Sequence, residues 1–82
     1  MIERPMSTHE FYAHVFTYRL DIYFAKQRYD QEVQALERLK AAYDGRVPQV
    51  DWDRQRRRVK AAYSRLAVRR SILHTFLEVL NN

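Results

Sequence analysis

One stretch of the sequence decides the fold: Tyr43-Asp44-Gly45-Arg46-Val47-Pro48-Gln49-Val50-Asp51-Trp52. It contains the single glycine of the 82-residue chain and one of its two prolines. Gly45 accepts the left-handed backbone conformation that ends many helices. Pro48 disfavours a helical conformation at Val47, the residue before it. We therefore expect two helices to meet here and the chain to reverse its direction.

The segments on either side of this stretch have the features of long helices. Ser7 and Glu10 form a capping box, S-x-x-E, and no Gly or Pro follows until Gly45. Asp51 is the expected N-cap of the second helix. We predict a single domain, residues 1–82, with helices over about 8–43 and 52–80 and a connector over 45–50.

Apolar residues recur every seven positions in both segments. In the first segment they are Val15, Ile22, Tyr29, Leu36 and Tyr43. In the second segment they are Trp52, Val59, Leu66, Leu73 and Leu80. A seven-residue repeat is typical of the seam of a coiled coil, and a reversal at the connector brings the two seams together. The sequence therefore predicts an all-α fold, an antiparallel two-helix hairpin that resembles a coiled coil.

The positions between these repeats are less uniformly apolar. In the second segment we place them four residues after each repeat, where Tyr63 and Leu77 fit the seam and Arg56 and Arg70 do not. In the first segment Glu32 falls in the seam, and we expect it to lie level with Tyr63. Polar groups in a seam usually set the register of the helices at a cost in stability, and we prefer that reading to a catalytic one.

The open end of the hairpin, opposite the connector, is more apolar than one seam requires. A second stripe in the first helix comprises Phe16, Leu20, Tyr23 and Phe24. A second stripe in the other helix comprises Val68, Ile72, Phe76 and Val79. Exposed patches of this kind usually mark an interface, so we expect the chain to dimerise or to dock a partner there. The alternative is that a kink in the first helix or a folded N-terminal arm covers the patch.

Positive charge concentrates in the second half of the chain. The net charge is +5, and residues 45–82 hold nine Lys and Arg against three Asp and Glu. The side chains that we expect to face solvent are Arg46, Arg54, Arg57, Arg58, Lys60 and Arg65. Such a block favours a negatively charged partner, either an acidic protein surface or the phosphates of a nucleic acid. The plainer interpretation is a solvated face, partly neutralised by Asp53 four residues before Arg57.

No motif of catalysis or metal binding is present. The sequence has no Cys, no Gly-rich phosphate loop and neither the H-E-x-x-H nor the G-x-S-x-G pattern. His9 and His14 lie about 140° apart around a helix and do not converge on one ion. His74 lies level with Asp21 in the expected hairpin and could pair with it, and we read such a pair as a structural hydrogen bond in preference to an active site. We therefore expect no enzymatic activity, no cofactor, no metal and no small-molecule substrate.

The combined features predict a non-catalytic interaction protein, namely an adaptor, an assembly subunit, a regulator or an inhibitor. It would bind itself or a larger protein with an acidic surface. The alternative is a dimeric RNA- or DNA-binding regulator that uses the segment Arg54–Arg65. No apolar run reaches the ~18 residues of a membrane span, and no signal peptide is visible, so we expect a cytoplasmic protein without a membrane partner.

Overall fold

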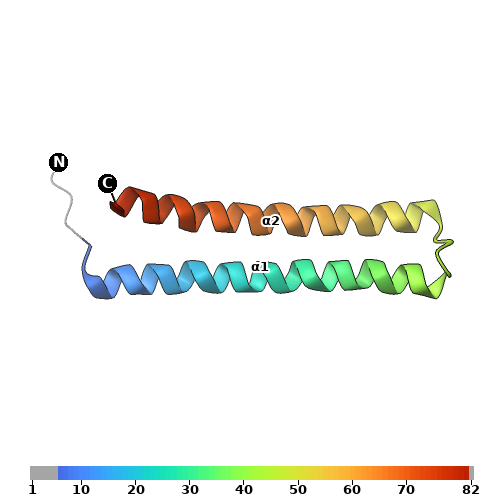
Figure 1. Ribbon diagram of the computed structural model, residues 1–82, viewed down its shortest axis with the longest axis horizontal. Coiled ribbons are helices and arrows are strands. Elements are labelled where there is room, and N and C mark those ends of the chain that lie inside the picture. Colours follow the sequence, from blue (N-terminus) through green and yellow to red (C-terminus); the bar gives the residue numbers. More distant parts are fainter. Residues whose placement is uncertain (1–5, 82) are drawn as a thin grey trace.

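The computed structural model describes residues 6–81 and shows two long helices side by side in opposite directions (Figure 1). Helix α1 spans Thr8–Ala42 and helix α2 spans Gln49–Asn81. The molecule measures 61 × 21 × 15 Å, so it is a rod that is two helices wide. The predicted all-α antiparallel hairpin is confirmed.

Helix α1 begins at the predicted capping residue. The Ser7 hydroxyl oxygen accepts a hydrogen bond of 3.1 Å from the backbone N–H of Glu10. Ser7 itself has an extended backbone, with φ −70° and ψ 159°. The cap satisfies one of the N–H groups that have no partner within the first turn of a helix.

The chain leaves α1 through two residues in the left-handed conformation. Asp44 has φ 50° and Gly45 has φ 81°. The N–H of Gly45 donates to the carbonyl of Lys40 at 2.8 Å, which satisfies a carbonyl at the helix end. The N–H of Arg46 donates to the carbonyl of Tyr43 at 2.9 Å and tightens the turn. The left-handed turn predicted at Gly45 is therefore present.

Helix α2 begins three residues earlier than predicted. The N–H of Trp52 donates to the carbonyl of Pro48 at 3.0 Å, which is already a helical hydrogen bond. Proline has a fixed φ and no N–H, so it suits a helix start, where N–H groups have no partner anyway. The prediction of Asp51 as N-cap is wrong: Asp51 lies in the first turn of α2, where its charge still complements the helix dipole.

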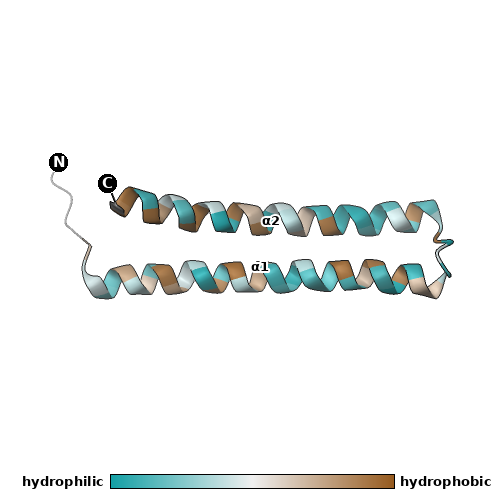
Figure 2. Ribbon diagram, viewed as in Figure 1, coloured by the Kyte–Doolittle hydropathy of each residue, from teal (hydrophilic) through white to brown (hydrophobic). Residues whose placement is uncertain are grey.

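The seam follows the seven-residue repeat except at its last member in each segment, Tyr43 and Leu80, which are 45% and 42% exposed. Its most buried apolar residue is Leu66, with 4% of its surface exposed, followed by Ala62 and Ala25. The repeat residues that are half-buried are Val15, Ile22, Tyr29, Leu36, Trp52, Val59 and Leu73. In Figure 2 hydrophobic residues recur along both helices, and hydrophilic residues dominate the part of α2 next to the connector.

The intermediate seam positions of α2 differ from the prediction. The residues that are buried or half-buried lie three positions after Trp52, Val59 and Leu73: Gln55, Ala62 and Phe76. Three positions after Leu66 lies Arg69, which is exposed. The residues four positions after each repeat are also exposed: Arg56, Tyr63, Arg70 and Leu77. Steps of three and four both agree with a mean spacing of 3.5 residues, and in the first layer of α2 the step of three places Gln55 in the seam and keeps the Arg56 guanidinium in water.

A polar layer crosses the seam at Glu32 and Gln55. The Gln55 side-chain amide donates to the Glu32 carboxylate at 3.0 Å and to the Glu32 backbone carbonyl at 2.9 Å. Arg28 Nε lies 3.6 Å from the other carboxylate oxygen. Glu32 thus faces Gln55 and not Tyr63 as predicted. The α2 partner of Glu32 therefore lies eight residues nearer the connector than predicted.

Gly45→Ala should lower the free energy of unfolding by about 1 kcal/mol. An added Cβ meets no atom within 4 Å, so the loss comes from the left-handed backbone alone. Gly45→Asn should lose less, since Asn tolerates this conformation. Urea unfolding followed by circular dichroism measures both. An alanine variant as stable as the parent would contradict the argument.

Leu66→Ala should lower the free energy of unfolding by about 2–5 kcal/mol, because it removes the most buried side chain of the seam. Leu77→Ala is the matched control, as Leu77 has 36% of its surface exposed. Its cost should stay below about 1 kcal/mol. Equal losses in the two variants would show that the seam is misassigned.

Gln55→Ala should cost about 1–3 kcal/mol, because it leaves the Glu32 carboxylate with Arg28 as its one remaining partner at the seam. Replacing Gln55 and Glu32 together with Leu should recover or exceed the parental stability. A double-mutant cycle by urea unfolding checks this. Additive losses would argue against coupling between the two side chains.

Candidate functional site

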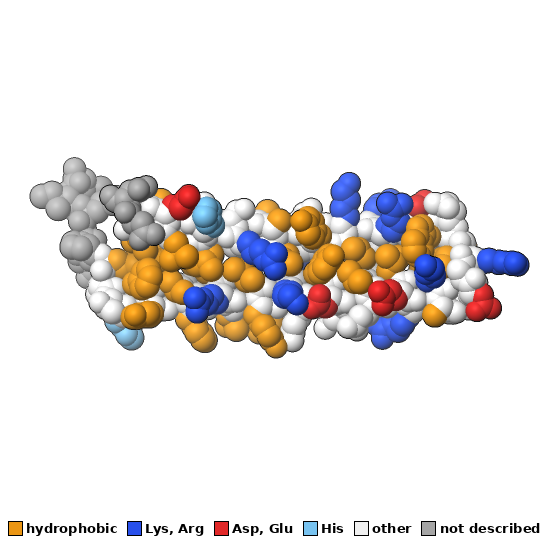
Figure 3. All heavy atoms as spheres, viewed as in Figure 1, with side chains coloured by type: hydrophobic (Ala, Val, Ile, Leu, Met, Phe, Trp, Pro, Cys, Tyr) orange, Lys and Arg blue, Asp and Glu red, His pale blue; other side chains and the backbone are white. Residues whose placement is uncertain are grey.

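A groove follows the seam near the connector, and we name it the basic groove. Its floor consists of Tyr29, Leu36, Val59 and Tyr63. Its α2 side consists of Asp53, Arg56, Arg57 and Lys60. The volume of about 720 Å³ is enough for a segment of chain. Figure 3 shows one face of the rod, on which hydrophobic side chains form a band along the boundary of the two helices with cations beside it.

The floor of the basic groove is apolar because both helices contribute repeat residues to it. The rings of Tyr29 and Tyr63 contact each other across the seam, with 5.8 Å between centroids and 58° between planes. Leu36 and Val59 continue the floor toward the connector. Tyr63 remains 55% exposed, so this part of the seam is open to a further partner.

The cations on the α2 side have no acidic partner. Among residues 6–81, no carboxylate forms an ion pair with Arg56, Arg57 or Lys60. Asp53 does not neutralise Arg57 as the sequence suggested. Its carboxylate accepts a hydrogen bond of 2.9 Å from Gln49, while Arg57 Nε donates to its backbone carbonyl at 3.4 Å.

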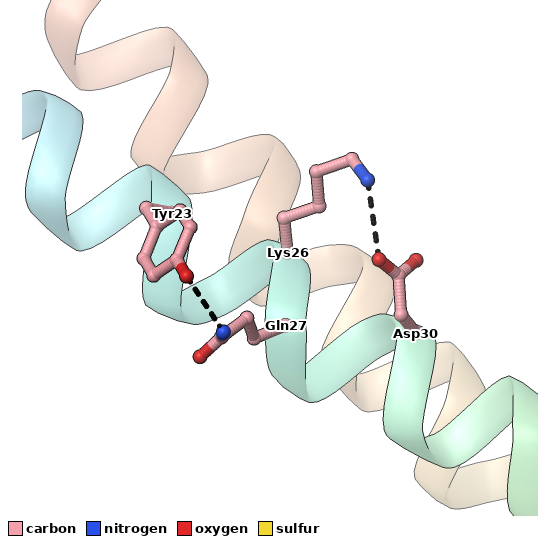
Figure 4. A network of polar contacts seen from close by, with 4 residues as sticks. All are labelled: Tyr23, Lys26, Gln27 and Asp30. Atoms are coloured by element: carbon pink, nitrogen blue, oxygen red, sulfur yellow. Dashed lines mark hydrogen bonds and ion pairs between the residues drawn. The ribbon is translucent and has the colours of Figure 1, made fainter.

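On α1, the charges near Tyr29 neutralise each other. Lys26 Nζ lies 3.1 Å from a carboxylate oxygen of Asp30, one turn further along the helix (Figure 4). Beside this pair, the Gln27 side-chain amide donates to the Tyr23 hydroxyl at 2.8 Å. The positive potential of the groove therefore comes from α2.

The six basic residues predicted from the sequence are all exposed, but they do not form one surface. Arg57 and Lys60 lie in the basic groove. Arg65 lines a smaller groove with Arg28, Arg69, Asp21, Phe24 and Ala25. Arg46 belongs to the connector, and the groove linings include neither Arg54 nor Arg58. Sequence reasoning missed Arg56, since it placed this residue in the seam.

The second stripe of α1 is exposed as predicted, and we name it the apolar outer face. The exposed fractions are 67% for Phe16, 41% for Leu20, 55% for Tyr23 and 56% for Phe24. Helix α1 continues without interruption through this stretch, so no helix break covers it. The N-terminal arm, residues 1–5, lies outside the described residues. At about 100° per residue, Phe16, Leu20 and Tyr23 point away from α2, while Phe24 lies at the edge of this face and lines the smaller groove with Arg65 and Arg69.

The second stripe of α2 is exposed except for Phe76. Val68, Ile72 and Val79 are 56%, 39% and 67% exposed. The Phe76 ring instead packs against α1, with its centroid 5.1 Å from that of Tyr18 and 6.2 Å from that of Phe11. The assignment of Phe76 to an exposed interface is therefore wrong, because its position three residues after Leu73 faces the seam.

No group of three or more His, Asp and Glu side chains in the described range is placed to hold a metal ion. His74 Nε2 lies 3.1 Å from Glu78 on its own helix, and the pair with Asp21 is not formed. Neither α1 nor α2 contains an apolar stretch of the length that crosses a lipid bilayer.

Comparisons with models of protein families, with curated proteins and with solved structures gave no match to this chain. The surfaces described above are therefore what indicates a function for this chain.

Proposed function

We propose that this chain is a small non-catalytic interaction protein that self-associates through the apolar outer face. One observation carries the proposal, the size of its accessible surface, which is 7047 Å². A compact monomer of 10.0 kDa exposes about 5,200 Å². The surplus of about 1,800 Å² accompanies the rod shape of the molecule, and the four large side chains of the apolar outer face, 41–67% exposed, belong to that accessible surface.

The core of the hairpin supports the same proposal. The buried residues are Ala25, Gln55, Ala62 and Leu66, and no described side chain has less than 2% of its surface exposed. A single seam of this kind supplies little stability, and association with a second surface adds to it by mass action. The large exposed rings of Phe16 and Phe24 are the most favourable groups to bury.

The basic part of α2 then remains available to a negatively charged partner. An adaptor, an assembly subunit, a regulator or an inhibitor would combine self-association with a basic surface for a partner. A cytoplasmic setting suits a chain without Cys. In the described part of the chain Arg54, Arg57 and Arg58 form no ion pair with a carboxylate, which favours a second candidate, a dimeric RNA- or DNA-binding regulator. Oligonucleotide binding that disappears between ~50 and ~200 mM salt would support that candidate.

Sedimentation velocity should show the parent chain as a dimer at roughly micromolar concentration. Phe16→Gln and Phe24→Gln should each raise the dimer dissociation constant by about tenfold or more, since each removes a ring from the interface. Val50→Gln is the matched control. Val50 is 66% exposed, as Phe16 is 67%, but it lies at the other end of the rod.

The control variant should sediment like the parent chain. A parent chain that stays monomeric at several hundred micromolar would contradict self-association. Equal effects of Phe16→Gln and Val50→Gln would contradict the assignment of the interface to the apolar outer face.

A further inference from the structure

We propose that the basic groove binds an amphipathic helix of a partner protein whose charged flank is acidic, which turns the hairpin locally into a three-helix bundle. The inference rests on the proposed interaction role, but it does not depend on self-association. The charges on the α1 and α2 sides of the groove indicate the charge of the partner helix.

The shape of the groove favours a helix. Its lining runs from Tyr29 to Leu36 on α1 and from Asp53 to Tyr63 on α2. These stretches are about 11–15 Å long, which corresponds to two or three turns of a third helix. A helix laid between two others buries one stripe of apolar residues, and the floor of this groove offers them tyrosine rings and aliphatic side chains.

The charge on the two sides of the groove sets the polarity of the partner. Arg56, Arg57 and Lys60 are exposed on the α2 side, and within residues 6–81 none of them forms an ion pair with a carboxylate. On α1, Lys26 and Asp30 already pair with each other. A bound helix therefore gains from Asp or Glu on the flank that faces α2, and the opposite flank gains nothing from charge. Basic residues on the flank facing α2 would be repelled.

A nucleic acid fits this groove less well than a helix. The half-buried Asp53 carboxylate in the lining would repel a phosphate and an acidic side chain alike, so it does not distinguish the two ligands. The apolar floor does distinguish them, because a helix covers it with apolar side chains and a phosphate backbone cannot. The rings of Tyr29 and Tyr63 pack on each other, which leaves less ring face for a base to stack on.

A second copy of the chain also lacks the required charge. The exposed apolar stripe of α2 includes Val68 and Ile72. Arginines surround these two residues in the sequence, at positions 65, 69 and 70. On α1, the stretch of the apolar outer face holds Arg19 and Asp21, whose charges cancel. The α2 stripe would bring cations to a groove that is itself basic, and the α1 stripe would bring no net negative charge. A flank of several carboxylates is therefore expected from a different protein.

The test uses a fluorescein-labelled synthetic peptide of about 14 residues, or four helical turns, and the full 82-residue chain. The peptide has Leu at helical i, i+3, i+4 and i+7 positions and Glu along one flank. A second peptide carries Lys in place of Glu. Fluorescence anisotropy should show binding of the Glu peptide at ~50 mM salt and weaker binding at ~200 mM. The Lys peptide should not bind.

Two double variants of the protein locate the binding site. Arg56→Gln with Lys60→Gln removes two charges from the groove, and we expect a roughly two- to thirtyfold loss of affinity for the Glu peptide. Arg54→Gln with Arg58→Gln removes the same charge from the same helix outside the groove lining. This control should stay within about twofold of the parent chain.

Amide chemical shifts of the ¹⁵N-labelled protein should change around Leu36, Val59 and Tyr63 when the Glu peptide is added. The inference is overturned if the Glu and Lys peptides bind equally, if the two double variants lose affinity equally, or if the shifts cluster at Phe16 and Phe24. It is also overturned if a 12-nucleotide poly-dT displaces the peptide at a lower concentration than unlabelled Glu peptide does, which would assign the groove to nucleic acid.

Sedimentation of the same variants separates this inference from the proposed function. Arg56→Gln with Lys60→Gln should leave the self-association of the chain unchanged. If it weakens the dimer while the Glu peptide fails to bind, a second copy occupies the groove. In that case the inference is lost and self-association stands. If the Glu peptide binds to a chain that is strictly monomeric, self-association is lost and the inference about the groove stands.

Discussion

A seam between two helices covers each of its residues from one side only. This constraint explains why Leu66, the best-covered apolar side chain, keeps 4% of its surface exposed and why the residues buried beside it are alanines and a glutamine. Larger side chains such as Tyr29 and Leu36 fill the seam but stay half-buried. A third surface is needed to bury them further. The exposed apolar area of this chain therefore follows from its architecture, and it lies where another helix or another molecule can pack.

The choice of which α2 face enters the seam also creates the basic groove. Burying Arg56 would desolvate a charge, whereas the chosen face buries Gln55 at that layer and Ala62 at the next. Gln55 then satisfies Glu32, the polar residue that α1 brings to the same layer. The neighbouring Arg56 is left at the side of the groove. The orientation of α2 about its own axis thus determines both which residues are buried in the seam and which cations lie at the side of the groove.

The sequence predicts the hairpin because its signals are local and agree with each other. Ser7 caps the first helix, Gly45 permits the left-handed turn, and the seven-residue repeat marks the seam. The rotation of α2 was not predictable in this way, since steps of three and of four residues fit the repeat equally well. The start of α2 was missed because Pro48 and Asp51 are both acceptable near a helix start. The sequence suggests an ion pair between Asp53 and Arg57, but the Asp53 carboxylate accepts a hydrogen bond from Gln49 instead.

The two candidate surfaces lie at different places along the rod, and this separation bears on the proposed role. The centre of the apolar outer face, near Leu20, is about 12 residues from the centre of the groove on α1, or roughly 18 Å along the helix. The basic groove opens on the seam, whereas the apolar outer face points away from α2. A partner on one surface therefore leaves the other accessible. A rigid rod with two independent surfaces holds two partners at a fixed distance, which is the physical requirement for an adaptor or an assembly subunit.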